Sequence, residues 1–196
     1  RSSDLIGGLT PLEGDHPHWI SYLSVANVDE AVKRLIASAE ERRGSPPLLL
    51  LDDVLSELDD PHLPQFSKAE LEAIVDEATR MERLVGAHCH GKRGIMAALE
   101  AGVKTIEHGT FMDDEAAEAM VETGAILVPT RFIVDLLVRE GQAHGMPEYA
   151  KAKIQMTAES HADGIALAIE KGVKIAMGTD IWATGIWGRN AEELPL

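Results

Sequence analysis

Short apolar runs recur along the chain, and apolar residues between them follow the spacing of amphipathic helices. The pattern predicts a helix over 67–81, a short helix over 94–101 and a long helix from about Pro147 to Lys171. Ser67 and Glu70 have the spacing of a capping box, which marks the start of the first of these helices.

A repeated unit organises the second half of the chain. Three times, at Gly102, Gly124 and Gly172, a helix ends in a glycine that an apolar run follows at once. Glycine suits the left-handed position that ends a helix. Strands separated by helices of this length pair in parallel, so we predict an α/β fold with a parallel sheet. The predicted strands begin at Leu48, Leu84, Val103, Ile126 and Lys174.

The N-terminal part is hard to assign. Glycine and proline interrupt residues 1–26, which is typical of a loop with at most one short strand. Asn27 and Glu30 then form a capping pair, and the helix that they begin is expected to end at Gly44. We expect residues 1–196 to form a single domain, of which 1–47 is the poorly assigned part.

The composition of the chain limits which partners it can bind and in which compartment it is expected. The chain has 196 residues, 45% of them hydrophobic, and a net charge of −15, so nucleic acid and an anionic membrane surface are expected to be repelled. A single cysteine excludes an internal disulfide and fits a reducing compartment. The start of the chain does not resemble a signal peptide, and no apolar run approaches the ~20 residues of a membrane helix. We therefore expect a cytoplasmic protein.

Three predicted strands end in polar turns that carry candidate metal ligands, namely His88, His108 and Asp180. Function gathers at the carboxyl ends of strands in parallel α/β folds. Two imidazoles and a carboxylate suit a divalent metal, zinc above all, as one or two ions. Such an ion lowers the pKa of its bound water to about 7, and Asp180 is the candidate general base for that water. The pattern predicts a metal-dependent hydrolase.

The remaining histidines allow several interpretations. His90 points to the same face as His88 if the strand continues. It is a candidate for binding substrate or for supporting a metal ligand, or else a solvated loop residue. Cys89 lies between them and is expected to pack away from the site. The His16–His18 pair has a spacing that can hold a metal, but no apolar strand leads into it, so an exposed loop is favoured. We interpret as structural His62, His144 and His161.

The ordered set of segments resembles the amidohydrolase superfamily, in particular its imidazolonepropionase-related branch with prolidase-like and carboxypeptidase-like dipeptidases. Between Val54 and Leu196 the resemblance is carried by Gly86–Gly91, Gly94–Val103, Ile106–Gly109 and Ala176–Asp180. It implies a (β/α)₈ TIM-type barrel of which strands four to eight are recognisable.

The resemblance also implies roles for individual residues. His88 would be the fifth-strand ligand, and Asp180 the eighth-strand ligand and general base. His108 would be the sixth-strand ligand, a position that contacts substrate or water in mononuclear relatives.

Two parts of the family pattern are missing from this sequence. The first-strand His-x-His in its apolar-Asp setting is absent, and Leu48–Leu51 stands where the fourth-strand lysine is expected. A full barrel needs ~250 residues, and 47 residues precede Leu48. We therefore expect an incomplete barrel, whose unpaired edge favours a homo-oligomer.

The leading hypothesis is a metal-dependent amidohydrolase that acts on a small-molecule substrate. The resemblance implies cleavage of an amide or peptide-like C–N bond, as in a dipeptide or an N-acyl amino acid. A lactone or other ester is an alternative, because the same hydroxide attacks either carbonyl. The alternative from another class is a non-catalytic barrel remnant or fragment that has lost its metal and acts as a binding or interaction module.

Overall fold

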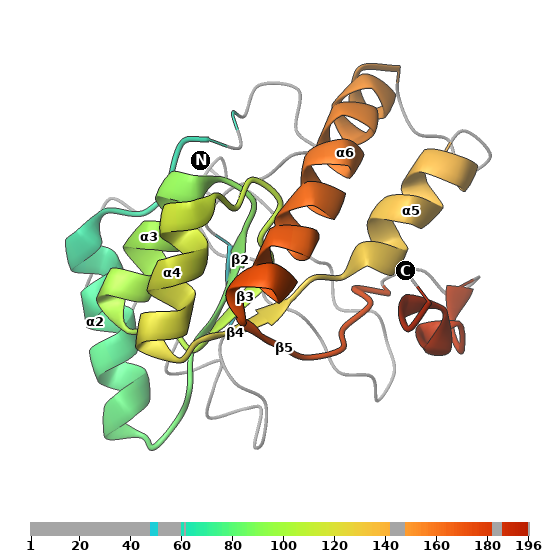
Figure 1. Cartoon of the computed structure of the whole chain (residues 1–196). Helices are drawn as coiled ribbons and strands as arrows, with labels where there is room; N and C mark the ends of the chain where they lie inside the picture. The colour runs from blue at the N-terminus through green and yellow to red at the C-terminus, as the bar shows by residue number, and fades with distance from the viewer. Residues whose placement is uncertain (1–47, 51–59, 61, 142–147, 182–185, 196) are drawn as a thin grey trace, which may run out of the picture.

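The computed structural model describes residues 48–50, 60, 62–141, 148–181 and 186–195. Within them, one sheet contains five parallel strands in the order β1-β2-β3-β4-β5 (Figure 1). The strands are β1 (Leu48–Leu50), β2 (Gly86–Cys89), β3 (Thr105–His108), β4 (Ile126–Val128) and β5 (Lys174–Ile175). Each strand pairs with the next one along the chain, which is the order of consecutive βα units in a (β/α)₈ barrel. The predicted parallel α/β fold is confirmed.

Helices connect and cover these strands. They are α2 (Lys68–Arg80), α3 (Lys92–Ala101), α4 (Asp114–Thr123), α5 (Arg131–Glu140) and α6 (Glu148–Lys171), followed by the short 3₁₀ helix η2 (Asn190–Glu193). Helix α3 packs between α2 and α4, and α6 packs against both α4 and α5 (Figure 1). None of the described helices is long and apolar enough to cross a membrane.

The helix ends follow the signals in the sequence. The capping box at α2 is present: the Ser67 hydroxyl accepts from the Glu70 amide at 3.4 Å, and the Glu70 carboxylate accepts from the Ser67 amide at 2.7 Å. Gly102, Gly124 and Gly172 have φ angles of 98°, 68° and 79°, the left-handed conformation predicted for them. Helix α3 begins at Lys92, two residues before the predicted start.

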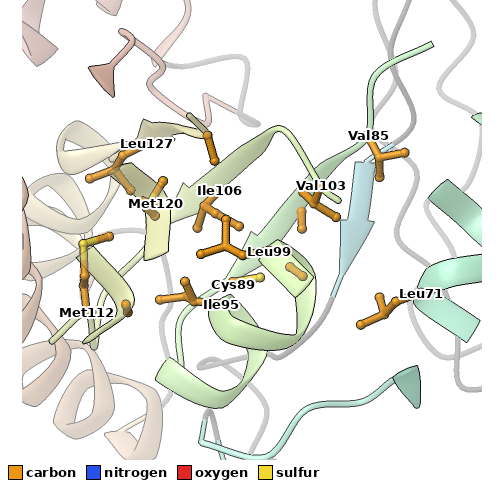
Figure 2. Close-up of a cluster of buried hydrophobic side chains, with 14 of the residues drawn as sticks. Leu71, Val85, Cys89, Ile95, Leu99, Val103, Ile106, Met112, Met120 and Leu127 are labelled. Carbon is orange, nitrogen blue, oxygen red and sulfur yellow. The ribbon is translucent and has the colours of Figure 1, made fainter. Parts of the chain in front are cut away.

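The core lies between the sheet and its helices. Figure 2 shows Cys89, Ile106 and Leu127 from successive strands among side chains of the helices, such as Ile95 and Met120. Cys89 is fully buried there, as expected for a packing residue. The residues that alternate with this layer, including His88 and Glu107, are half-buried on the other face of the sheet. That face carries the candidate site.

Some sequence predictions fall outside the described residues. They concern the helix after Asn27, the His16–His18 pair and His144. Two elements were not predicted at all, α5 and η2. Helix α5 lacks the usual start signal, because the side chain of its first flanking residue, Thr130, makes no capping bond.

Candidate metal centre

Three histidine rings meet at the carboxyl ends of β2 and β3. Nδ1 of His88 lies 2.7 Å from Nε2 of His108. The rings of His90 and His108 are stacked, with centroids 4.5 Å apart. One ring nitrogen from each of the three residues lies within 4.8 Å of the others. Among the described residues, these histidines form a group of donors that could hold a metal ion.

His108 reaches this group through an unusual backbone conformation. Strand alternation places His108 on the core face with Ile106, and its register partner is the buried Cys89. The φ angle of His108 is 72°, however, and its ring contacts His88, which belongs to the opposite face. Alternation along the sequence could not reveal this reversal.

Positive φ angles recur at the carboxyl ends of three neighbouring strands. His108, Thr130 and Asp180, at or just beyond the ends of three neighbouring strands, have φ angles of 72°, 53° and 50°. The one further non-glycine residue of this kind in the described part of the chain is Glu82. Such conformations cost roughly 1–3 kcal/mol each and gather at functional sites. The backbone therefore supports a site at this edge.

Buried polar side chains orient the rings. The Thr110 hydroxyl lies 2.8 Å from His90 Nδ1, and the Thr130 hydroxyl lies 2.6 Å from His108 Nδ1. His161 of α6 donates from Nε2 to the carbonyl oxygen of His108 at 3.1 Å. His161, interpreted from the sequence as structural, thus lies directly beneath the site. Sequence reasoning overlooked both threonines, although each closely follows a predicted strand.

Burial keeps His90, His108 and His161 neutral. It lowers the pKa of His90 and of His108 well below the ordinary value, and the neighbouring histidines act in the same direction. Burial also lowers the pKa of His161 to about 4, with a further contribution from the charge of Arg131. Neutral imidazole is the form that binds a metal, so these rings suit that task at neutral pH.

Asp180 lies beyond β5 at the same edge of the sheet. Burial raises its pKa to about 7, and the charge of Glu107 on β3 acts in the same direction. Burial also raises the pKa of Glu107, which accepts a hydrogen bond of 2.8 Å from the Thr105 hydroxyl. The group of close donors contains His90 where the sequence-based set has Asp180. The structure therefore brings together His88 and His108 of the predicted ligands and adds His90.

The donor set fits a divalent cation. Glu107 and Asp180 have pKa values raised by burial, and a cation nearby would favour the ionised form of both acids. The bond between His88 and His108 joins the two nitrogens that would hold the ion. A metal would take the place of the proton that they share.

The fold and this site define a class: a partial (β/α)₈ barrel with a histidine-rich site at the carboxyl ends of its strands. Comparison with known proteins gives the family. The amidohydrolase family model matches residues 19–194, and the chain belongs to this family.

Relatives support the predicted prolidase-like branch. Ochratoxinase of Aspergillus niger is 40% identical over 160 residues, which are 81% of this chain and 33% of ochratoxinase. Its crystal structure superposes with a TM-score of 0.75 at 39% identity over 87% of this chain and 38% of that one. The structure of a Xaa-Pro dipeptidase with bound methionine superposes with a TM-score of 0.75 at 32% identity, over 87% of this chain and 42% of the dipeptidase. The structure of a prolidase complexed with N-methylphosphonate-L-proline superposes with a TM-score of 0.76 at 31% identity, over 82% of this chain and 39% of the prolidase.

Coverage of these relatives is partial. The chain spans between 33% and 48% of the length of the curated relatives that it matches. The predicted family, and a barrel of which this chain holds only part, are both confirmed.

Proposed function

We propose that this chain carries part of the active site of a metal-dependent amidohydrolase that cleaves an amide or peptide-like C–N bond. The observation that carries the proposal is the group of closely spaced histidines at the carboxyl ends of β2 and β3, in which burial lowers the pKa of His90 and of His108. The names of two relatives, a Xaa-Pro dipeptidase and a prolidase, favour a dipeptide as substrate, and an N-acyl amino acid is the alternative that the sequence resemblance implies.

The residues divide the work as follows. His88 and His108 would hold a divalent ion, with zinc as the best-suited metal and one or two ions as the expected number. Asp180 would be a further ligand. His90, whose ring is fixed by Thr110, would contact the substrate, and its place in the donor group makes it a candidate ligand as well.

Proton transfer would fall to Asp180. A bound divalent ion supplies an activated water and polarises the substrate carbonyl. Asp180 would accept the proton of the attacking water at a carboxylate oxygen and deliver it to the departing nitrogen. Burial raises the pKa of Asp180 to about 7 in the metal-free protein, and a bound cation would lower that pKa, so the group would be an ionised proton acceptor at neutral pH.

A matched pair of variants tests this assignment. Asp180→Asn keeps the shape of the side chain and removes the base, so hydrolysis of a dipeptide panel should fall by about 10²–10⁴-fold with an unchanged far-UV circular dichroism spectrum. Asp163→Asn removes an exposed carboxylate from α6 and should leave turnover unchanged. Retained turnover in Asp180→Asn would remove this residue from the mechanism.

The same assay separates the alternatives. Lactones and aryl esters belong in the substrate panel, because preferential turnover of these compounds would favour an ester hydrolase. An unmodified full-length protein that neither hydrolyses any of them nor retains metal would favour the non-catalytic binding module.

Other expectations stay predictions. We propose a single domain over 1–196, a cytoplasmic location and a homo-oligomer. Analytical ultracentrifugation of the full-length protein tests the last of these, and a stable monomer would contradict it.

A further inference from the structure

The hydroxyl of Thr130 has two close polar neighbours. Its oxygen lies 2.6 Å from the carbonyl oxygen of Pro129 and 2.6 Å from Nδ1 of His108. A hydroxyl carries one proton, and a carbonyl oxygen can only accept. The proton therefore goes to Pro129, and the Thr130 oxygen accepts a hydrogen bond from Nδ1–H of His108. Thr130 is only 3% exposed, so bulk water does not compete for these contacts.

We propose that Thr130 is a positioning residue that fixes the tautomer of His108 and thereby presents its Nε2 lone pair to a metal. A neutral imidazole carries one N–H, so a proton held on Nδ1 leaves Nε2 as an acceptor. That nitrogen lies 2.7 Å from Nδ1 of His88, which accordingly donates to it. The consequence for metal binding rests on the proposed function, whereas the position of the proton does not.

The opposite arrangement has a physical cost. If Thr130 donated to His108, its proton would leave the Pro129 carbonyl, and Nε2–H of His108 would point at His88. Pro129 is buried, and a buried acceptor that loses a donor is destabilised.

The start of α5 gives independent support for the role of Thr130 in positioning His108. Threonine next to a helix start commonly caps the helix, but the Thr130 side chain makes no such bond. The Glu193 carboxylate accepts from the backbone amides of Arg131 at 2.8 Å and Phe132 at 2.7 Å instead. Another residue thus does the capping, while Thr130 keeps a left-handed backbone and faces His108.

The test compares two substitutions at one position. Thr130→Val keeps the branched shape and removes the hydroxyl, whereas Thr130→Ser keeps the hydroxyl. Long-range ¹H–¹⁵N correlation spectra of metal-free, histidine-labelled full-length protein report the tautomer, with the His108 signals assigned by their loss in His108→Gln. We expect the Nδ1–H form in the wild type and in Thr130→Ser, and loss of that form in Thr130→Val.

Metal affinity provides the second readout. Titration with zinc alone should give a dissociation constant about 10–100-fold weaker in Thr130→Val, the usual effect of losing a group that orients a ligand, and near wild type in Thr130→Ser. Thr110→Val is the matched control for the tautomer spectra, because it removes a comparably buried hydroxyl from His90 and should leave the His108 tautomer unchanged.

Two results would overturn the proposal: an unchanged His108 tautomer in Thr130→Val, or an equal change in Thr130→Ser. If the valine variant does not fold, Thr130→Gly removes the same hydroxyl and accepts the left-handed backbone, so it decides the question in the same way. The spectra of metal-free protein remain decisive even if the protein hydrolyses nothing, which keeps this test separate from that of the proposed function.

Discussion

Gly164 of α6 lies against the turn that follows His108, and a side chain there would press on that turn. A Cβ atom at this position would lie 3.2 Å from the carbonyl oxygen of Thr110 and 3.3 Å from that of Gly109. Both contacts are with backbone, which cannot rotate away. The same helix carries His161, whose hydrogen bond supports the His108 carbonyl. Gly164→Ala should therefore move the helix, the turn, or both by a few tenths of an ångström.

Two opposing effects set the size of the change. Alanine in place of glycine in a helix interior stabilises by about 1 kcal/mol. Overpacking in a close-packed interior costs about 1–3 kcal/mol. The free energy of unfolding should then fall by roughly 0–2 kcal/mol, which for a protein of this size lowers Tm by up to ~8 °C. Zinc affinity should fall as well, because the turn positions His108 and Thr110.

Urea denaturation and zinc titration of Gly164→Ala measure both effects. Ala152→Gly is the control, because it reverses the substitution at an exposed site of the same helix and should lose about 1 kcal/mol through helix propensity alone. Gly164→Ala could instead raise the free energy of unfolding by the amount that Ala152→Gly lowers it and leave zinc affinity unchanged. That result would show that α6 does not pack against this turn and would refute the reasoning.

Three further substitutions probe other contacts. Glu193→Gln removes the charge that caps α5 and should lower the free energy of unfolding by about 1–3 kcal/mol in urea denaturation. Glu192→Gln, at an exposed neighbouring position, should change it by less than about 0.5 kcal/mol. Equal effects of the two substitutions would contradict the capping role of Glu193. The pKa of His161 is about 4 when folded and 6.5 ordinarily, so the folded state binds fewer protons and stability should fall by up to roughly 3 kcal/mol as the pH drops between these values. His161→Gln should reduce the loss of stability between pH 6.5 and 4, and an unchanged slope of stability against pH would show that His161 is not its source. Gly178→Ala would overlap Val128 and should cost about 1–3 kcal/mol by thermal denaturation; wild-type stability would refute the close approach of the two segments.

Elements with local signals were predictable from the sequence. The capping box at Ser67 and the glycine at Gly102 each act within a few residues, so the ends of α2 and α3 follow from the sequence. The inward packing of Cys89 follows from strand alternation. His88 and His108 were found because polar residues at neighbouring strand ends are expected to meet.

The rest depends on contacts between distant residues. Helix α5 was missed because its cap, Glu193, comes from about 60 residues further along the chain. The place of His90 in the donor group depends on the reversed backbone of His108, which brings the two rings into a stack. Thr130 was missed for the same reason, since its partner lies on another strand.

The most direct test of the central claim is a crystal structure of the full-length protein with zinc, with anomalous data recorded at the zinc edge. We expect a zinc peak at about 2.0–2.1 Å from Nδ1 of His88 and Nε2 of His108, with the Asp180 carboxylate bound to the same ion or to its water. A map without a peak between these two rings, or with the Asp180 carboxylate more than about 10 Å from the ion, would contradict it.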